Sequence, residues 1–550
     1  MSQITVFKAR RIHTMSKSNP VADAVAVRDG MILEAGKFED LEPWLEGQDH
    51  VVDEQFSDKI LFPGFIDPHL HPSLGAIILP CAFVTAFEWD LGGNRKIPAT
   101  RGKQEWLDQA AKEFEERDKS QPIFVLYGYH RTWHGQIGRH ELNEISSDAP
   151  IISWHRSCHE VILNDAAINL LQIDREVMKN HPQIDEENGV FFESGSMVAV
   201  GALRPYLFSP DWFMKGLEDL KTLIQAGGHT TVGDMAWGIF DFEAEWAAYS
   251  HIIEEAEAPL RVQLIPRGIP EAELSGDPKE ALQKIEELSD RGSHRLFFDK
   301  HVKLFTDGAF FSELMQLQEP GFIDGHHGEW LTPPEQFEAA ARAYWNEGYR
   351  IHVHCTGSLG VELAVDVLEK LQFERPRFDH RFTIEHFGVS TEEQVGRIKA
   401  LGGLVSANVY YVHELGEAYW KHSIGHERAS QMSRLGSLAR ADMPFTVHSD
   451  FPLAPARPLT NAWVAVNRIA ESGVVFGPEE RVSVDDAMRA ITIHAAYILG
   501  QEDRIGSIRS GKAADFTVLD EDPYEVDPIT LKDIRIHATV FEGKTVLCER

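Results

Sequence analysis

This 550-residue chain is poor in cysteine, and the few cysteines that it has are not paired in sequence. The four residues lie far apart, at Cys81, Cys158, Cys355 and Cys548. A disulfide framework has more closely and regularly spaced cysteines. Their scarcity and wide spacing argue against a disulfide-stabilised secreted protein and favour a reducing compartment.

Basic residues and long apolar runs are also scarce. The chain has 53 Lys and Arg against 86 Asp and Glu, which gives a net charge of −33. Such an acidic surface argues against nucleic acid and anionic membranes as partners. No stretch approaches the roughly 18 uninterrupted apolar residues that a membrane span needs. The first residues lack a basic segment followed by an apolar core. We therefore expect a cytoplasmic protein.

Both ends of the chain are predicted to form β-structure. Residues 3–57 alternate apolar and polar positions, and Asp29-Gly30 is a good two-residue hairpin turn. Residues 506–550 show the same alternation. Neither end has enough strands to bury a core by itself. We therefore expect residues 1–57 and 506–550 to form one small composite β-sandwich.

Between the two ends, short β-rich runs alternate with longer helical patterns. This order is typical of βα units and a parallel sheet, and we expect a (β/α)8 TIM-like barrel over residues 58–505. The eight candidate strands are 60–67, 229–235, 260–266, 299–305, 350–354, 381–386, 402–407 and 444–450.

The first two candidate strands are about 160 residues apart, several times the length of a normal βα connection. Residues at about 75–215 are therefore predicted to form an inserted α/β subdomain. Its expected elements are a helix over 104–119 and strands over 123–127 and 151–154.

Several candidate strands end in side chains that bind metal ions. Side chains two apart on a strand point the same way, so the first strand can offer two imidazoles to one ion. Strand ends meet at one mouth of a TIM-like barrel. Each histidine taken singly also fits an ordinary core or surface residue, but their joint placement favours a hydrolytic metal centre. The candidate ligands are His69, His71, Lys303, His354, His386 and Asp450.

Lys303 is the unusual member of this set. A lysine at the end of a buried strand is costly to bury as a bare cation. The position fits a neutral amine, or a lysine carboxylated by carbon dioxide that bridges two ions. It also fits a lysine that reaches solvent.

These motifs resemble those of the amidohydrolase superfamily. Residues 63–71 resemble its opening strand. Four short segments and the closing run resemble its YtcJ-like branch (amidohydrolase family 3), which includes N-substituted formamide deformylase. These segments are 303–308, 354–357, 384–386, 449–452 and 487–519, and the resemblance spans nearly the whole chain.

The resemblance implies a barrel with a terminal β-sandwich and a centre of one or two zinc ions, for which another divalent metal could substitute. His69 and His71 would hold one ion, and His354 and His386 the other. A carboxylated Lys303 would bridge them, and Asp450 would be ligand and general base.

The implied activity is that of a zinc-dependent amidohydrolase. It would use metal-activated hydroxide to cleave an amide, N-formyl or N-acyl amine C–N bond in a small molecule. A deaminase or cyclic-amide hydrolase would look alike, although single-metal deaminases generally lack the bridging lysine. A non-catalytic binding paralogue is a third reading, against which the complete ligand set argues. Enzymes of this kind often associate in pairs, so a homodimer is also an expectation.

Other polar residues are candidates for the substrate pocket. His159 is predicted to bind substrate or to stabilise an oxyanion, with a structural role in the insertion as the alternative. His352 and His448 are interpreted as supporting residues rather than ligands. Ser358 replaces the family's usual Asp, so substrate identity is not inherited. The remaining substrate-binding candidates are His130, Arg131, Trp133, Asp307, Tyr410 and Arg428.

Overall fold

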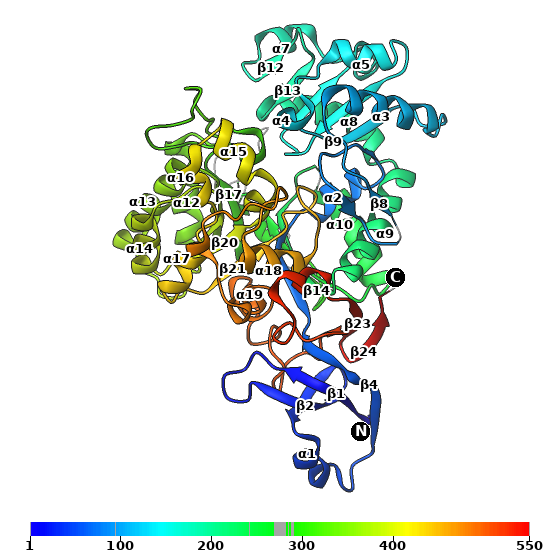
Figure 1. Ribbon diagram of the computed structural model, residues 1–550, viewed down its shortest axis with the longest axis vertical. Coiled ribbons are helices and arrows are strands. Elements are labelled where there is room, and N and C mark those ends of the chain that lie inside the picture. Colours follow the sequence, from blue (N-terminus) through cyan, green and yellow to red (C-terminus); the bar gives the residue numbers. More distant parts are fainter. Residues whose placement is uncertain are drawn as a thin grey trace.

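A computed structural model describes residues 2–93, 95–240, 242–268, 282–283, 285–287 and 291–548. Strands and helices alternate through most of these ranges, so the predicted α/β class is confirmed (Figure 1). Within the described residues, none of the helices combines the length and the apolar character that crossing a bilayer requires.

Strands from the two ends of the chain form one seven-stranded sheet, in the order β24-β23-β22-β4-β1-β2-β3. In Figure 1 the blue N-terminal strands and the red C-terminal strands lie next to each other. The seven strands are β1 (Ile4–His13), β2 (Val21–Arg28), β3 (Met31–Gly36), β4 (His50–Pro63), β22 (Phe516–Leu519), β23 (Ile536–Phe541) and β24 (Lys544–Leu547).

The contact between the two ends is made by β4 and β22, which pair antiparallel. Phe7 of β1 and Phe516 of β22 pack edge to face in the core of this sheet, with ring centroids 6.2 Å apart. The predicted turn is confirmed, because Asp29 and Gly30 both have positive φ, 53° and 74°, as a two-residue turn matched to strand twist requires. The grouping of residues 1–57 and 506–550 as one β-sandwich domain stays a prediction.

Two parallel sheets lie at the centre of the chain, in the orders β16-β15-β14-β5 and β17-β18-β19-β20-β21. Their strands are almost fully buried, as expected for parallel sheets covered by helices. The strands are β5 (Phe65–Leu70), β14 (His229–Trp237), β15 (Arg261–Pro266), β16 (Leu296–Phe298), β17 (His301–Phe305), β18 (Arg350–Cys355), β19 (Thr383–His386), β20 (Leu404–Asn408) and β21 (Phe445–His448).

Seven of the eight predicted strands overlap a single observed one, but the first does not. The predicted strand 60–67 spans the end of β4 and the start of β5, with Gly64 between them. A Cβ atom at Gly64 would lie 2.0 Å from Oγ1 of Thr230. Only glycine therefore allows β14 to approach the chain here, and the strand breaks at this point.

Backbone hydrogen bonds link the two parallel sheets at two places. The N–H of Asp450 donates to the carbonyl of His69 (3.1 Å), which joins the end of β21 to β5. The N–H of Gly268 donates to the carbonyl of Lys303 (2.9 Å), which joins the end of β15 to β17. Closure of the strands into a (β/α)8 barrel stays a prediction.

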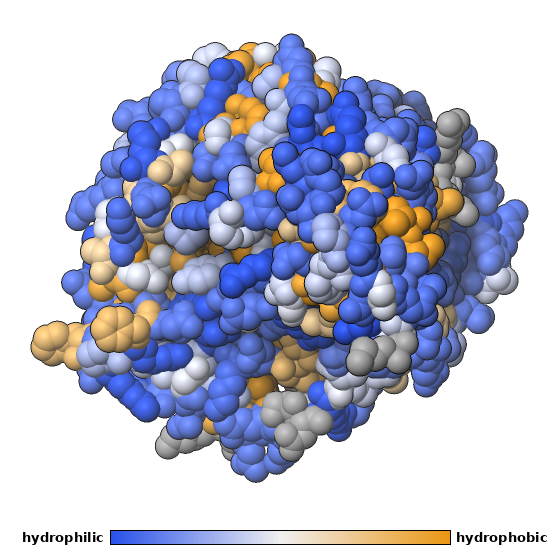
Figure 2. Space-filling view, turned by 90° about the horizontal axis from the view of Figure 1, so that it is seen from below, coloured by the Kyte–Doolittle hydropathy of each residue, from blue (hydrophilic) through white to orange (hydrophobic). Residues whose placement is uncertain are grey.

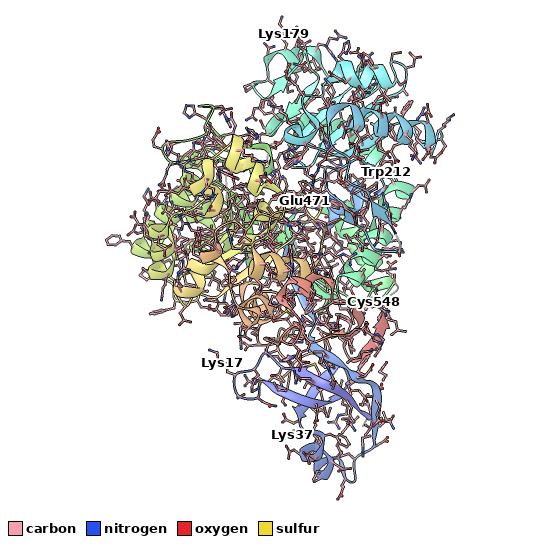
Figure 3. The ribbon with its side chains drawn as sticks, in the orientation of Figure 1. Lys17, Lys37, Lys179, Trp212, Glu471 and Cys548 are labelled. Carbon is pink, nitrogen blue, oxygen red and sulfur yellow. The ribbon has the colours of Figure 1, made fainter. Side chains whose placement is uncertain are left out.

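The insertion contains a six-stranded sheet in the order β12-β13-β11-β10-β9-β6. The predicted helix and strands are confirmed as α3 (Lys103–Glu116), β9 (Phe124–Tyr129) and β10 (Ile151–His155). This subdomain and the seven-stranded sheet lie at opposite ends of the molecule. In Figure 3, Lys179 marks the outer end of the insertion, and Lys37 marks the outer end of the sheet.

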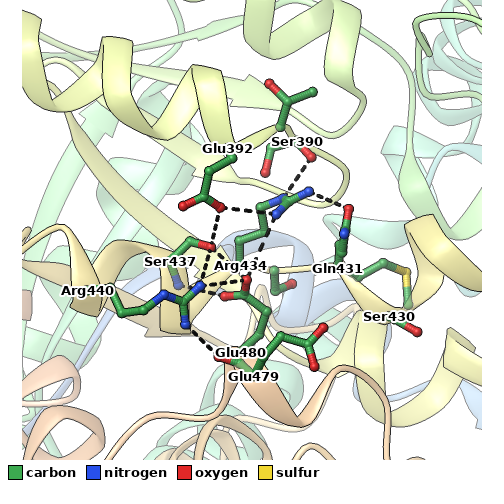
Figure 4. Close-up of polar contacts among 12 residues, drawn as sticks. Ser390, Glu392, Ser430, Gln431, Arg434, Ser437, Arg440, Glu479 and Glu480 are labelled. Carbon is green, nitrogen blue, oxygen red and sulfur yellow. Dashed lines mark hydrogen bonds and ion pairs between the residues drawn. The ribbon is translucent and has the colours of Figure 1, made fainter.

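A polar network connects the segments around residues 390, 434 and 480 (Figure 4). Glu480 accepts hydrogen bonds from the backbone N–H and the hydroxyl of Ser437, both at 2.6 Å. Arg434 donates from Nε to the carbonyl of Ser390 (2.9 Å), just after β19. The network therefore ties α17 (Leu435–Arg440) to the loop that follows β19.

The face of the molecule seen in Figure 2 is mainly hydrophilic, with hydrophobic residues in small separate patches. This agrees with the large excess of acidic side chains over basic ones. Scattered apolar side chains of this kind are normal for a water-soluble surface.

A buried ion pair should stabilise the junction between β15 and the C-terminal strands. Arg261 Nη1 lies 2.6 Å from Asp515 Oδ2, and both side chains are buried. Arg261→Met would leave the carboxylate unpaired in the interior. We expect a loss of about 3–5 kcal/mol in the free energy of unfolding, measured by urea denaturation. The control is Lys8→Met, because the Lys8–Glu54 pair is largely exposed and such pairs are worth under about 1 kcal/mol. Equal losses would contradict this assignment.

Candidate metal centre

The structure brings the six predicted ligands together at the carboxyl ends of the parallel strands. Asp450 lies at the centre of the group. Its Oδ1 is 3.1 Å from Nε2 of His71 and 3.4 Å from Nε2 of His69, and its Oδ2 is 3.4 Å from Nδ1 of His386. Nζ of Lys303 is 3.4 Å from Nε2 of His69.

His354 joins the group through its neighbour on the next strand. Its ring centroid is 4.4 Å from that of His386. The five strands that supply the ligands are widely separated in sequence, but their ends meet in one buried cluster. This is the placement that the strand-end pattern predicts.

His448 also belongs to the cluster. One ligand atom from each of His69, His386, His448 and Asp450 lies within 4.8 Å of the other three. The sequence reading placed His448 in a supporting role, although it precedes Asp450 by two residues and shares its side of the strand. Its Nδ1 is 2.7 Å from the hydroxyl of Ser406, so the other ring nitrogen faces the cluster, 3.3 Å from Nδ1 of His386.

The backbone is strained at the ligands. His386, Phe387 and Asp450 have φ angles of 72°, 49° and 58°, a left-handed conformation that costs side-chain-bearing residues on the order of 1–3 kcal/mol each. Such strain persists where the surrounding structure enforces it, and it clusters at functional sites. Two of the three strained residues are predicted ligands.

Asp67 joins the first and last strands at the cluster. Its carboxylate accepts hydrogen bonds from the N–H of His69 (3.1 Å) and from the N–H and hydroxyl of Ser449 (3.1 and 2.6 Å). Burial raises the pKa of Asp67 to about 7, although these hydrogen bonds oppose the shift. Asp67 thus sets the spacing between the strand of His69 and the segment of Asp450.

Glu385 orients one of the ligands. Its Oε2 is 2.7 Å from Nδ1 of His69, which turns Nε2 of that ring towards Lys303 and Asp450. Carboxylates commonly hold metal-binding histidines in this way, because they fix the tautomer and the ring orientation. Sequence reasoning missed this role. The glutamate beside His386 was quoted in a motif, but nothing local indicates its contact with β5.

The residues present fit a divalent metal ion. Burial lowers the pKa of His69, His354 and His386 well below the usual value, so these imidazoles are neutral, as a ligand must be. Nε2 of His354 and Nδ1 of His71 are buried ring nitrogens without a hydrogen-bond partner. Imidazole nitrogens beside a carboxylate form a donor set that suits zinc.

A cavity opens beside the cluster, with walls from the insertion and from the parallel strands. His71 lines it on the strand side, together with Phe305. The insertion contributes His159 and Glu193, whose Nδ1 and Oε2 are 2.7 Å apart. The ring of His159 lies 6.2 Å from that of His354. His159 therefore reaches the cavity from the insertion, as predicted, and Glu193 is a partner that the sequence did not indicate.

Six predicted substrate residues are not among the described residues that line this cavity. Three of them follow β9 in the insertion. The ring of His130 packs against Trp133 at 4.5 Å, and Arg131 lies 3.8 Å from Glu160. Substrate binding by them stays a prediction. The six are His130, Arg131, Trp133, Asp307, Tyr410 and Arg428.

The other three have structural partners. Asp307 accepts hydrogen bonds from the N–H groups of Thr356 (3.0 Å) and Gly357 (2.8 Å), which holds the turn after β18. The hydroxyl of Tyr410 donates to a carbonyl in the loop after β21 (3.2 Å). Arg428 donates to two carbonyls of a neighbouring loop. These contacts shape the loops around the strand ends.

A model of the amidohydrolase family matches residues 57–547, which is most of the chain. The chain belongs to the amidohydrolase family. This confirms the resemblance stated from the motifs, including the YtcJ-like branch.

Similar amidohydrolases cover the chain almost end to end. The putative amidohydrolase YtcJ of Bacillus subtilis is 24% identical, over 97% of this chain and 98% of its own. N-substituted formamide deformylase of Arthrobacter pascens is 23% identical, over 97% and 96%. The crystal structure of an uncharacterized metal-dependent hydrolase from Pyrococcus horikoshii has the same fold, with a TM-score of 0.73, 20% identity, and coverage of 96% and 99%.

Metal content should depend on the clustered residues. We expect near two equivalents of zinc in the purified protein. Lys303→Ala should reduce this to one or fewer, and His69→Ala/His71→Ala should reduce it sharply, because each change removes predicted ligands. Elemental analysis measures both. His140→Ala is the control, since that histidine is 82% exposed in the insertion. Unchanged zinc in Lys303→Ala would show that the lysine bridges no ions.

Proposed function

We propose that this amidohydrolase is a zinc-dependent enzyme that cleaves the C–N bond of an amide, N-formyl or N-acyl amine in a small molecule. The observation that carries the proposal is the buried cluster of imidazoles, carboxylate and lysine beside a cavity. A match to the amidohydrolase family over most of the chain supports it, as does full-length similarity to an N-substituted formamide deformylase.

We also infer that eight of the nine parallel strands, all except β16, form a single (β/α)8 barrel. Backbone hydrogen bonds between the two sheets at both junctions support closure. The barrel spans residues 58–505 with an insertion at about 75–215. Residues 1–57 and 506–550 form a composite β-domain, whose strands share one sheet.

In this proposal His69 and His71 would hold one zinc ion, and His354 and His386 would hold the other. Lys303, once carboxylated, would add an anionic ligand. Burial lowers the pKa of Lys303 to about 8, so a larger share of the amine is neutral and able to react with carbon dioxide. Bound zinc would polarise the substrate carbonyl and lower the pKa of water.

Asp450 takes up the proton of the attacking water and returns it to the leaving nitrogen. Burial alone would raise the pKa of Asp450. The hydrogen bond from His71 opposes this effect, and the pKa is lowered overall. The carboxylate is therefore ionised near neutral pH and able to accept a proton.

His159 faces the reaction from the insertion. Glu193 accepts a hydrogen bond from its Nδ1 and would stabilise an imidazolium. That form of His159 can donate from Nε2 to the oxygen of the substrate carbonyl. Glu193 has a φ of 45°, and its backbone N–H also donates to the carbonyl of His159 (2.8 Å). The pair is therefore held rigidly, as a preorganised oxyanion donor requires.

The cavity walls indicate the substrate class. Trp154, Val200, Phe240 and Phe305 supply apolar surface, and the polar lining residues include His71, His159 and Glu193. Such a pocket favours a small substrate with an aromatic or other apolar portion attached to the scissile amide.

Asp450→Asn tests the central part of the proposal. Wild-type protein should hydrolyse members of a panel of N-formyl and N-acyl arylalkylamines, and a chelator should abolish this activity until zinc is restored. Asp450→Asn should lower kcat by about 10³-fold, because it removes the proton acceptor, while zinc content is retained. If a substrate is hydrolysed equally fast with and without a chelator, or if Asp450→Asn keeps full activity, the proposal is wrong.

His159→Ala should lower kcat by about 10²-fold, as loss of an oxyanion donor does, with a much smaller change in KM. Glu193→Gln should show part of the same loss, because it weakens the imidazolium. Steady-state kinetics on the best substrate of the panel measures both. Cys158→Ser, a change in the same wall, is the matched control. If His159→Ala changes only KM, His159 takes part in substrate binding and does not stabilise the oxyanion.

A further inference from the structure

A row of polar side chains, all buried except the partly exposed Arg350, runs beneath the candidate metal centre, towards the amino-terminal ends of the parallel strands. Four contacts connect it. Arg350 Nη1 is 3.3 Å from His301 Nε2, and His301 Nδ1 is 2.8 Å from His352 Nε2. His352 Nδ1 is 2.6 Å from Glu385 Oε1, and Glu385 Oε2 is 2.7 Å from His69 Nδ1.

Strand register explains the row. His301 of β17 lies opposite Arg350 of β18, and Glu385 of β19 lies opposite His354. Alternate residues of a strand share a side, so Arg350, His352 and His354 point to the same interior. Arg350 and His354 are four residues apart, about 13 Å along a strand. The row therefore connects the metal centre to the far end of the strands.

Arg350 indicates which atom donates and which accepts in each hydrogen bond of the row. A guanidinium group can only donate hydrogen bonds, so Nε2 of His301 must accept. A neutral imidazole then carries its hydrogen on the other nitrogen. Nδ1 of His301 therefore donates to Nε2 of His352, and Nδ1 of His352 donates to Glu385. Arg350 at one end only donates, and the Glu385 carboxylate at the other only accepts. Both ends therefore favour the same tautomers of the two histidines.

The same donor-to-acceptor order continues to His69, a predicted metal ligand. With His352 donating to one oxygen, Glu385 remains a carboxylate whose other oxygen accepts from Nδ1 of His69. Nε2 of His69 then keeps its lone pair, and it faces Lys303 and Asp450, each at 3.4 Å.

We propose that Arg350 is a remote positioning residue, which fixes the donor direction of this row and thereby holds His69 in the tautomer that binds metal. The inference concerns residues outside the cavity, and it rests on the proposed function for the presence of the ion.

A competing acceptor shows what Arg350 prevents. Asp299 Oδ2 lies 3.9 Å from Nε2 of His301 and 3.6 Å from Nη1 of Arg350. Without the guanidinium, His301 can turn its hydrogen to Nε2 and donate to Asp299. The row then reverses, and Nδ1 of His352 presents a lone pair to Glu385. That contact is repulsive, and it weakens the hold of Glu385 on the ring of His69.

Five variants of the full-length protein, four single and one double, separate this role from simple packing. Arg350→Met removes the donor. Arg350→Lys keeps a group that only donates. Asp299→Ala removes the competing acceptor, and it is combined with Arg350→Met in a double variant. Asp379→Ala is the control, because it removes the other carboxylate near Arg350, at 3.7 Å, and leaves the row intact.

The primary measurement is the rate at which zinc-loaded protein releases zinc to a chelator. We expect Arg350→Met to accelerate release about tenfold, the lower end of the effect of losing an outer-shell partner of a metal ligand. Arg350→Lys, Asp299→Ala and Asp379→Ala should stay near the wild-type rate, and the double variant should recover most of it. Histidine ¹⁵N chemical shifts of the zinc-free protein report the tautomers directly.

A wild-type release rate in Arg350→Met, with unchanged histidine tautomers, would overturn the inference. The inference would also be wrong if the double variant or Arg350→Lys released zinc as fast as Arg350→Met. The faster release would then reflect lost packing. If Arg350→Met does not fold, Arg350→Gln replaces it. The amide of this variant can donate or accept, so we expect a zinc-release rate between those of the wild type and Arg350→Met. Release at the wild-type rate would again overturn the inference. Absence of zinc from the wild type would instead refute the proposed function, and the tautomer measurement would still test the row.

Discussion

The candidate centre depends on buried carboxylates that accept hydrogen bonds from more than one strand. Asp67 holds the ends of β5 and β21 at a fixed spacing, and Glu385 couples β5 to β18 and β19. A buried carboxylate without such partners would be very costly. The strands must therefore sit where they satisfy these two groups, and the ligands that they carry are positioned as a consequence.

Much of the fold follows from local pattern. Continuous apolar runs identify the parallel strands, and alternation with Asp29-Gly30 identifies the N-terminal hairpin. The boundary at Gly64 could not be predicted in this way. Pro63-Gly64 is a possible break signal, but apolar residues continue on both sides of it and the segment was predicted as one strand. The glycine is required by the approach of Thr230. That contact comes from a strand more than 160 residues away in the sequence.

The candidate site also divides into residues that local pattern predicts and residues whose roles depend on long-range contacts. His69, His71, Lys303, His354, His386 and Asp450 were predictable because each lies at a strand end, and strand ends of a parallel array meet. Glu193, Glu385 and Arg350 were not recognised, because their roles depend on partners in other elements. His448 was only partly predictable. Alternation along its strand places it on the side of Asp450, but the contacts from Ser406 and His386 that turn its ring inward are long-range.

The shared sheet of the two ends has a consequence for biosynthesis. β4 pairs with β22, which begins at Phe516, so the first strands leave the ribosome long before their partner exists. At ordinary translation speeds the delay is on the order of tens of seconds. During that time β4 presents an unpaired edge, the kind of surface that associates with other chains. The nascent protein is therefore most exposed to aggregation before its last strands are made, and a chaperone that covers its first 60 residues would protect it most.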